Sequence, residues 1–385
     1  MTNAQKELLK LQVQNENVIF GELKNTYSSA LKSINDKIKI LQGSNLQSKI
    51  YQLQYQKALK KQVSAILDNL TSNSYSSIQS YLEKSYEFGY LGTMYDLQKQ
   101  GIPLIFQINQ ENVVNSILNN AKLSKSLYES LGVNVNDLKK QINVDISRGL
   151  ASDMSYSEIA RSFNLKMGTG LYNAKRIVRT ESGRIQSEGS YDCMVKAKDA
   201  GADVVKQWDS TLDGKTRPSH RELDGQIKEI DEPFVVNGHS ALYTHGFGVA
   251  SEDVNCRCRV VQRAKWLVED EENFTKWDNE NRTLIDLSGY KSYEEFKKAY
   301  YDKIDYFDEY KDYVKILEEK APSNFDDFLS IRKSDDFNLY KQYVKALEKK
   351  ELTALADFEL YKHTSNEIDS ELIGLTAKNG IEIKG

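Results

Sequence analysis

Apolar residues in the first 150 positions recur at the spacing of an amphipathic helix. One stripe follows the i, i+4, i+7, i+8 pattern at Leu23, Tyr27, Ala30, Leu31, Ile34, Ile38 and Leu41. Gly43-Ser44-Asn45 interrupts this pattern. A second stripe follows at Leu46, Ile50, Leu53, Leu59, Val63, Ile66, Leu67 and Leu70. The stripes predict two antiparallel helices joined by a short loop, whose apolar faces form a core or, alternatively, dock on a partner.

Further helices are expected before the pattern changes to short strands. They are predicted at about 75–100, 110–121, 134–150, 159–163 and 171–200, and Ser155 with Glu158 forms an S-x-x-E capping box for the fourth of them. From Gly201 to Arg263, short apolar runs alternate with Asp-Gly and Asn-Gly pairs, which favour hairpin turns. This stretch predicts a small α+β unit with a short, irregular antiparallel sheet.

The last third contains an internal repeat with a period of 30 residues. The string YKDYVKILE at 310–318 recurs as YKQYVKALE at 340–348, and each copy predicts two short helices. Two copies are too few for a stable solenoid, so a satellite bundle or an arm is expected, followed by a tail at 375–385. The fold class is therefore mainly α. Its regions are N-terminal helices that dock on a partner (1–147), an embedded α+β module (148–265) and an acidic helical repeat region (266–385).

Composition restricts the class of protein. No apolar run approaches the ~20 residues of a membrane span, so no membrane association is expected. Three cysteines exclude a disulfide scaffold and suit a reducing cytosol. The pI near 5.8 argues against nucleic-acid binding. However, residues 1–147 carry a net charge of +4 and residues 266–363 a net charge of −8, so the acidity belongs to the last third. A weak contact of the remaining chain with DNA stays open.

Groups able to bind metal collect in the middle module. Cys256 and Cys258 form a C-x-C pair, and His220 is the natural third ligand of a zinc ion. Candidate fourth ligands are His239, His245, Asp213 and Asp224. The alternative is structural: two cysteines on one face of a strand pack as small hydrophobic side chains, and His220 is a satisfied hydrogen-bond donor. Cys193 lies on a predicted helix and is expected in the core.

The same module contains residues that suit two other kinds of site. Arg179 and Glu181, with Asp213 and His220, suit acid–base catalysis, but no nucleophile elbow, HExxH, P-loop or GxGxxG motif accompanies them. We therefore predict no enzymatic activity and no catalytic residue. A nucleic-acid-binding patch would comprise Arg217, Arg221, Arg257, Arg259 and Arg263. Bonds between these arginines and carboxylates are the favoured reading.

An ordered set of residues in this module resembles the phage Mu F-like minor head, or head morphogenesis, proteins. The resemblance covers about residues 145–262. It rests on Arg179, Glu181, Trp208, Asp213, Arg217, His220, Asp224, Gly225, Asn255, Cys256 and Cys258. The family often has Pro-Gly where this chain has His245-Gly246, which weakens His245 as a ligand.

The resemblance implies a minor capsid protein of a tailed bacteriophage. Its expected partners are the portal protein and the major capsid or scaffold protein, with an effect on DNA packaging or ejection and a possible weak contact with packaged DNA. Its expected location is the virion, in the capsid interior or at the portal vertex, after assembly in the cytoplasm of the bacterial host. The resemblance also implies metal binding at His220, Cys256 and Cys258, with zinc as the possible cofactor. The alternative is a zinc-dependent enzyme or a phage-delivered toxin or effector carrier.

Overall fold

The computed structural model describes residues 1–42, 49–118, 127–151, 156–267, 287–349, 358–359 and 361–362. The chain divides into two compact units, one comprising residues 1–100 and 108–271 and the other residues 101–107 and 272–385. The fold is mainly α with small sheets, as predicted. The predicted loop at 43–45, the N-cap Ser155 and the tail at 375–385 lie outside the described residues.

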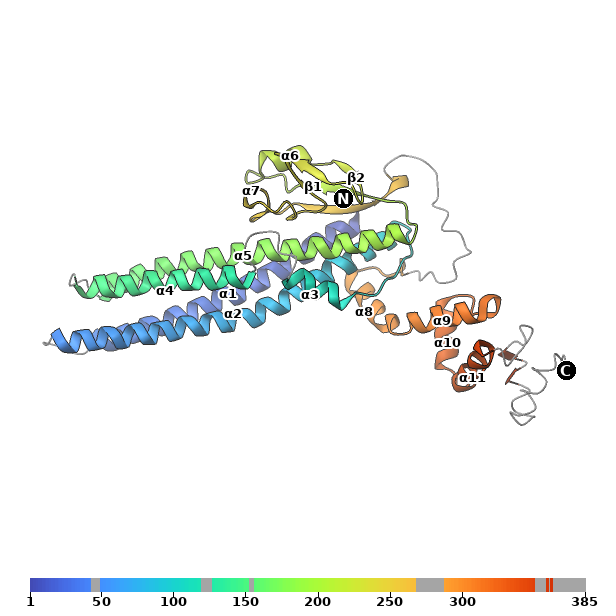
Figure 1. Cartoon of the computed structure of the whole chain (residues 1–385), viewed down its shortest axis with the longest axis horizontal. Coiled ribbons are helices and arrows are strands. Elements are labelled where there is room, and N and C mark those ends of the chain that lie inside the picture. Colours follow the sequence, from blue (N-terminus) through green and yellow to red (C-terminus); the bar gives the residue numbers. More distant parts are fainter. Residues whose placement is uncertain are drawn as a thin grey trace. The chain divides into compact units, whose positions relative to one another are not determined.

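Long helices lie side by side in the first unit (Figure 1). They are α1 (Asn3–Gln42), α2 (Lys49–Lys99), α4 (Leu127–Ala151) and α5 (Tyr156–Asp199), with the shorter α3 (Gln110–Leu118) against α2 and α5. The apolar stripes meet between them, and Ile34, Leu67 and Phe163 are fully buried there. Among the described helices, none has an apolar stretch long enough to cross a bilayer.

Two of the breaks predicted between helices were wrong. The helix expected at 75–100 is the second half of α2, and the helices expected at 159–163 and 171–200 are one helix, α5. The apolar face of α2 continues from Leu70 to Ile78 across a polar run, at helical spacing. In α5, a Cβ on Gly170 would lie 3.2 Å from Leu138 and 3.4 Å from Tyr27. Packing of α1 and α4 at this position outweighs the ~1 kcal/mol that glycine costs a helix.

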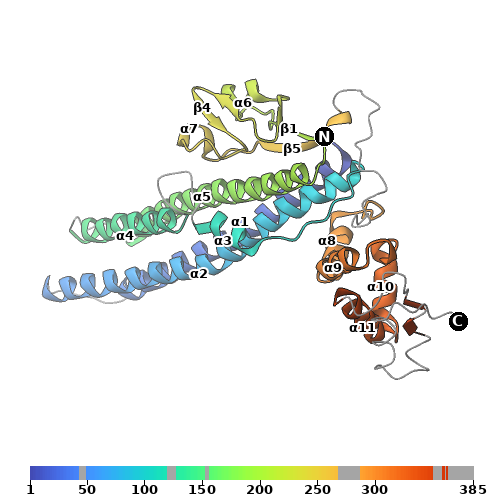
Figure 2. The ribbon, with the colours of Figure 1, turned by 45° about the vertical axis from the view of Figure 1, so that its right-hand side comes forward.

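Two glycines let α2 and α5 approach closely. A Cβ on Gly89 would lie 2.0 Å from the backbone oxygen of Gln186, and one on Gly189 would lie 2.5 Å from that of Tyr86. Because no larger residue fits either contact, the glycines set the spacing of the two helices. This spacing fixes the helical surface on which the α+β module lies (Figure 2).

The strands of the module pair antiparallel, as the turn residues predict, but they form two small sheets where one was predicted. Strands β1 (Val204–Asp209), β2 (Ile227–Glu229) and β5 (Arg259–Ala264) pair in the order β2-β1-β5, and β3 (Phe234–Val236) pairs with β4 (His239–Ala241). Asn237 and Gly238 form the β3–β4 turn with φ of 50° and 76°, the conformation that an Asn-Gly hairpin requires. The short helices are α6 (Pro218–Leu223), α7 (Ala250–Asp253) and the 3₁₀ turn η1 (Lys265–Leu267).

The second unit contains the predicted repeat as short helices. They are α8 (Tyr293–Ile304), α9 (Phe307–Leu317), the 3₁₀ turn η2 (Glu318–Lys320), α10 (Phe325–Lys333) and α11 (Phe337–Glu348). Helices α9 and α11 begin 30 residues apart at Phe307 and Phe337. In both helices, the lysine four residues later lies over the phenylalanine ring. The distance from Nζ to the ring centroid is 4.1 Å for Lys311 and 4.8 Å for Lys341. Buried tyrosine and phenylalanine rings form the core of this unit.

Candidate metal centre

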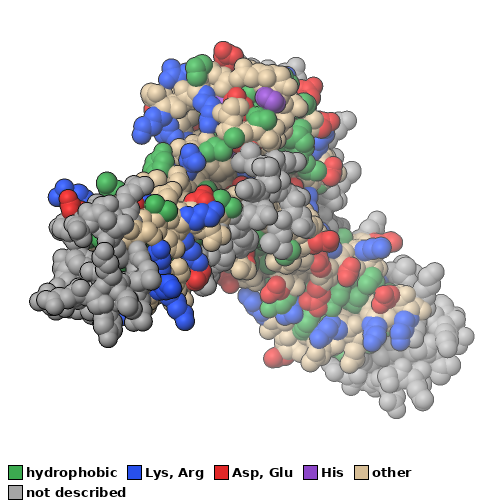
Figure 3. Space-filling model, turned by 60° about the vertical axis from the view of Figure 1, so that its left-hand side comes forward, with side chains coloured by type: hydrophobic (Ala, Val, Ile, Leu, Met, Phe, Trp, Pro, Cys, Tyr) green, Lys and Arg blue, Asp and Glu red, His purple; other side chains and the backbone are tan. Residues whose placement is uncertain are grey.

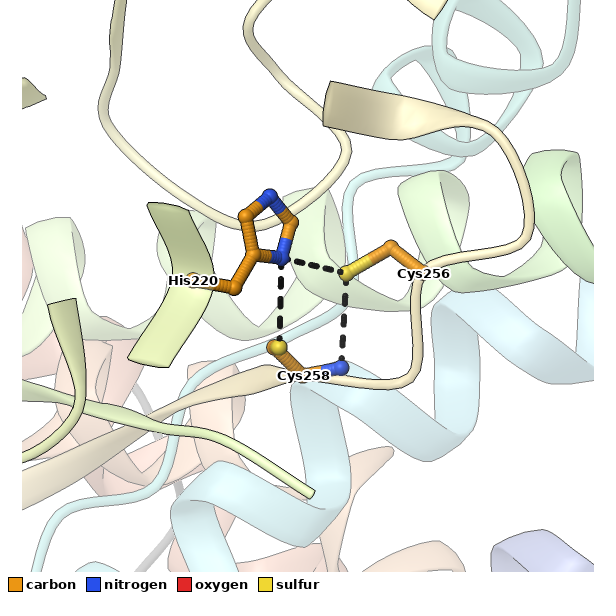
Figure 4. Close-up of side chains that lie close together, drawn as sticks. All are labelled: His220, Cys256 and Cys258. Carbon is orange, nitrogen blue, oxygen red and sulfur yellow. Dashed lines mark hydrogen bonds between the residues drawn. The ribbon is translucent and has the colours of Figure 1, made fainter. Parts of the chain in front are cut away.

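Three buried side chains converge in the module (Figure 4). Nδ1 of His220, on α6, lies 3.4 Å from Sγ of Cys256 and 3.4 Å from Sγ of Cys258. The two cysteines precede β5, in the loop that follows α7. The three donor atoms all lie within 4.8 Å of one another. The structure thus brings together the three residues that the sequence singled out.

The donor set and its spacing fit a tetrahedral zinc ion. Zinc binds thiolate sulfur at ~2.3 Å and imidazole nitrogen at ~2.0–2.1 Å, so tetrahedral angles place the nitrogen and a sulfur roughly 3.6 Å apart. The observed nitrogen–sulfur distances of 3.4 Å are close to that value. Two sulfurs and one imidazole are also the soft ligands that favour zinc.

The other nitrogen of His220 faces a carboxylate. Nε2 lies 3.2 Å from Oε2 of Glu252, and both side chains are buried. Glu252 also accepts hydrogen bonds from Ser219 at 2.9 Å and Asn237 at 3.2 Å. Burial raises the pKa of Glu252, but these hydrogen bonds outweigh it, and the net shift is downward. An ionised carboxylate behind a histidine ligand fixes the ring and directs its other nitrogen toward a metal.

The pKa values of the two thiols shift in opposite directions. The hydrogen bond from Cys256 holds the pKa of the Cys258 thiol below its usual range, and His220 and Ser210 act in the same direction. The same hydrogen bond, together with burial, raises the pKa of Cys256. Cys258 is therefore the sulfur that is more readily a thiolate, which is the form that binds a metal.

The candidate fourth ligands lie elsewhere. Asp213 is bound by Arg257, and Asp224 accepts a hydrogen bond from the backbone of Ser210. Nε2 of His245 lies 3.1 Å from the backbone oxygen of Cys256, and burial lowers the pKa of His245 to about 4. Neutral His245 therefore donates to that oxygen and positions the cysteine loop. Among the described residues, the metal-binding group contains three ligands only.

Motif residues on α5 hold the cysteine loop against the helices. Arg179 forms two bonds with Glu16 of α1, at 2.5 and 2.9 Å, and a third with Oδ1 of Asn255 at 3.0 Å. The hydroxyl of Thr180 accepts a hydrogen bond from the backbone N–H of Asn255 at 2.9 Å. Asn255 has φ of 57°, a left-handed conformation that asparagine tolerates well. Glu181 binds Arg184 inside the helical core.

The remaining motif residues build the loops around the candidate ligands. The buried Trp208 ring contacts the His220 ring edge-on, with 5.5 Å between the ring centroids. Nε1 of Trp208 donates a hydrogen bond to the hydroxyl of Ser210. Arg217 donates to the backbone oxygen of Val254. Gly225 has φ of 77° and follows Asp224 at the end of α6, where a left-handed residue is needed. The motif therefore positions loops, and only its histidine and cysteines converge as ligands.

The arginines of the predicted nucleic-acid patch bind protein groups. Arg257 forms two bonds with Asp213, at 2.6 and 2.7 Å, and these hold the pKa of that carboxyl far below its usual value. Arg221 donates to the backbone oxygen of Asp213, Arg259 to Gln12 and Arg263 to Gln207. On the face in Figure 3, basic and acidic side chains of the module are interspersed. The predicted bonds with carboxylates are confirmed for Arg257. Arg217 and Arg221 instead bind backbone oxygens, and Arg259 and Arg263 bind side-chain amides.

Two residues at this site carried no signal in the sequence. Glu16 lies more than 160 positions from Arg179, and Glu252 is one of many acids. Each acquires its role from tertiary contacts alone. Cys193 is fully buried in α5, as predicted.

Comparison with known proteins gives a consistent family. The profile described as Phage Mu protein F like protein matches residues 140–261, which include every candidate ligand. Minor head protein GP7 of Bacillus phage SPP1 is 29% identical over 211 residues, covering 53% of this chain and 67% of that protein. NAD(+)--arginine ADP-ribosyltransferase EFV of Enterococcus faecalis is 31% identical over 363 residues, covering 92% of this chain and 69% of that protein. No solved structure matches the chain.

Proposed function

This chain belongs to the Phage Mu protein F-like family of minor head proteins, and we propose from this premise that it is a non-enzymatic structural component of a tailed-phage head. It would dock on the portal, major capsid or scaffold protein during assembly in the host cytoplasm, and remain at the portal vertex or in the capsid interior. There it would influence DNA packaging or ejection.

One observation carries the proposal: the family motif is used to fix the module on the long helices. Arg179 and Thr180 bind Asn255, and Arg179 also binds Glu16 of α1. Motif residues that hold loops and helices together suit an assembly component, since a docking part must keep its shape on binding.

The long helices also supply exposed apolar side chains for docking. Leu165 and Tyr172 lie seven residues apart on one face of α5 and are 70% and 63% exposed. Apolar side chains in this position are typical of surfaces that are covered on assembly. They support the predicted role of the helices as the docking element.

We further propose that His220, Cys256 and Cys258 hold a structural zinc ion. The ion would link α6 to the loop before β5, and so join two parts of the module that are 36 residues apart. Neutralised thiolates and a histidine backed by Glu252 suit such a link.

Co-expression with the cognate portal and procapsid proteins tests the docking. We expect the chain to co-sediment with one of them on a density gradient, and Leu165→Glu with Tyr172→Glu to weaken this association at least tenfold. Leu212→Glu is the matched control, because Leu212 is 65% exposed on a module loop. Absence of co-sedimentation with both partners would contradict the proposal.

The relative named as an ADP-ribosyltransferase motivates a second candidate function, in which the chain carries a toxin or effector, or is itself a zinc-dependent enzyme. About a third of that relative lies outside the match, and its name describes that protein only. Incubation of the purified chain with NAD⁺ and an arginine analogue tests this candidate. NAD⁺ turnover that is lost in His220→Ala would favour the zinc enzyme, and turnover that persists would favour the transferase.

A further inference from the structure

A groove runs along the first turns of α1, between this helix and β5. Its volume is about 270 Å³, near the lower end for a ligand site. One wall comprises α1 residues from Gln5 to Glu16, and a second comprises Arg259, Val260, Val261 and Gln262 of β5. Residues of α2, α5 and the cysteine loop line the rest of the groove. Gln5 and Glu16 are eleven steps apart on the helix, which is roughly 16 Å and the length of about five residues of extended chain. Figure 2 shows β5 near the N-terminal end of α1.

Strand β5 is an edge strand whose open side is only partly covered. Lys265 N–H donates to Asp203, so odd-numbered residues of the strand bond to β1 and even-numbered residues face the open edge. At that edge, Gln5 and Gln100 side chains donate to the oxygen of Gln262, and Gln100 accepts from Ala264 N–H.

Val260 is the next residue that faces the open edge. None of the hydrogen bonds between described residues involves its backbone N–H or C=O. A strand edge with free backbone groups is a template for an added strand. Here the glutamine caps limit the addition to the stretch around Val260, inside the groove.

A guanidinium without a direct ion pair lies on the groove wall. Arg259 is half-buried, and its one side-chain hydrogen bond goes to the neutral Gln12 at 2.6 Å. Among the described residues, no carboxylate lies within 4.0 Å of Arg259, whereas Arg179 and Arg257 at the same groove bind Glu16 and Asp213. Asp209 faces Arg259 on β1 and attracts it from beyond this distance, so the guanidinium has a counter-charge but no direct ion pair. A partly desolvated cation without a direct ion pair favours an anionic ligand.

The rim of the groove is apolar. Leu9 and Val13 lie on one face of α1 and are 37% and 48% exposed, beside the partly buried Val260. This combination of a free strand edge, one arginine without a direct ion pair and an apolar rim selects the chemistry of the occupant.

We propose that the groove between α1 and β5 binds an extended, acidic and apolar segment of a partner protein by strand addition. The segment's backbone pairs with Val260, its carboxylate binds Arg259, and its apolar side chains cover Leu9 and Val13. A DNA duplex does not fit, because the groove holds about 270 Å³ and its backbone hydrogen-bonding groups match a polypeptide. The partner's membership of the phage head rests on the proposed function, whereas the groove's chemistry does not.

Fluorescence anisotropy with two defined peptides tests the proposal. The probe is fluorescein-labelled Thr-Val-Glu-Val-Glu-Val-Thr with both ends blocked, and the matched peptide has glutamine for each glutamate. We expect the glutamate peptide to bind the purified chain saturably. Arg259→Gln is expected to weaken it about tenfold and to leave the glutamine peptide unchanged, because a charge-assisted bond is lost. Arg263→Gln is the control on the same strand, since Arg263 binds Gln207.

Two further variants separate binding from folding. Gln12→Glu neutralises Arg259 without removing it, so it should weaken the glutamate peptide while the melting temperature is kept. N-methylation of the central valine should weaken both peptides, because it removes the donor needed for strand addition.

The proposal would be overturned if the glutamate peptide showed no saturable binding at protein concentrations up to about 1 mM. It would also be overturned if Arg259→Gln bound the glutamate peptide as tightly as the unmodified chain does. If the peptide binds but the chain does not co-sediment with portal or procapsid proteins, the groove proposal stands and the proposed docking on the phage head is rejected. If the chain co-sediments but the peptide does not bind, only the groove proposal is rejected.

Discussion

At the scale of single residues, the module depends on polar groups that are buried with matched partners. His220 faces two sulfurs through one nitrogen and Glu252 through the other. Lys206 is fully buried, and its ammonium group donates to the backbone oxygens of Ile230 at 2.7 Å and Leu242 at 2.9 Å. Burying such groups is costly without partners, so each marks a position where one substitution has a large effect.

If the candidate metal centre holds zinc, loss of one ligand should lower both the zinc content and the melting temperature. Cys256→Ser removes one of three ligands, so the zinc content of the purified protein should fall from about one per chain to less than about 0.2. The melting temperature should fall by about 5 °C or more. Elemental analysis and a thermal melt measure both. Cys193→Ala is the control, because that cysteine is buried away from the centre. An unchanged melt would favour two cysteines packed as small hydrophobic side chains.

The lowered pKa of Lys206 predicts how the free energy of unfolding depends on pH. Burial lowers its pKa from 10.5 to about 8, so between about pH 8 and 10 the unfolded chain holds a proton that the folded chain has lost. The free energy of unfolding should therefore rise with pH across this window, relative to Lys206→Met. Subtracting the variant's urea-unfolding data removes the other titrating groups, which both proteins share. A flat difference between pH 8 and 10 would contradict a lowered pKa.

At the scale of elements, glycine decides how closely two helices approach. Gly89 of α2 faces the backbone of α5 at a distance that leaves no room for a methyl group, whereas Gly21 of α1 has no atom within 4 Å of the place of a Cβ. The same residue type therefore has opposite effects at the two positions. Helix propensity favours alanine at both, and only the contact distinguishes them.

A pair of alanine substitutions tests this difference. Gly89→Ala should lower the free energy of unfolding by about 1–3 kcal/mol, because the backbone oxygen of Gln186 must move. Gly21→Ala should leave it unchanged or raise it by up to about 1 kcal/mol. Urea unfolding followed by circular dichroism measures both. Equal effects of the two substitutions would mean that α2 and α5 are not held at this spacing.

At the scale of the whole molecule, the charge distribution separates a near-neutral module from the acidic last third. All five arginines of the predicted nucleic-acid patch donate to protein groups, which leaves fewer of their N–H donors for a phosphate backbone. The net negative charge of the last third would repel DNA through like charge. The chain is therefore expected to meet proteins more strongly than nucleic acid.

Binding of duplex DNA checks this expectation. At 150 mM salt we expect a dissociation constant weaker than roughly 10⁻⁴ M, at the weak limit of non-specific binding, and a shallow dependence on salt. Anisotropy of a labelled 30-base-pair duplex measures both. Tighter binding with a steep salt dependence would show that arginines leave their carboxylate partners to bind phosphates.

The amino-acid sequence is sufficient to predict the class of fold, the repeat, the Asn237-Gly238 hairpin and the three candidate ligands, because helical periodicity, turn chemistry and ligand type are local properties. Tertiary packing was needed to show that α2 and α5 are unbroken, that Glu252 stands behind His220, and that Glu16 meets Arg179. The free edge at Val260 likewise follows from which strand pairs with which. These features join residues far apart in the chain, and packing energy between distant segments leaves no periodic trace in either one.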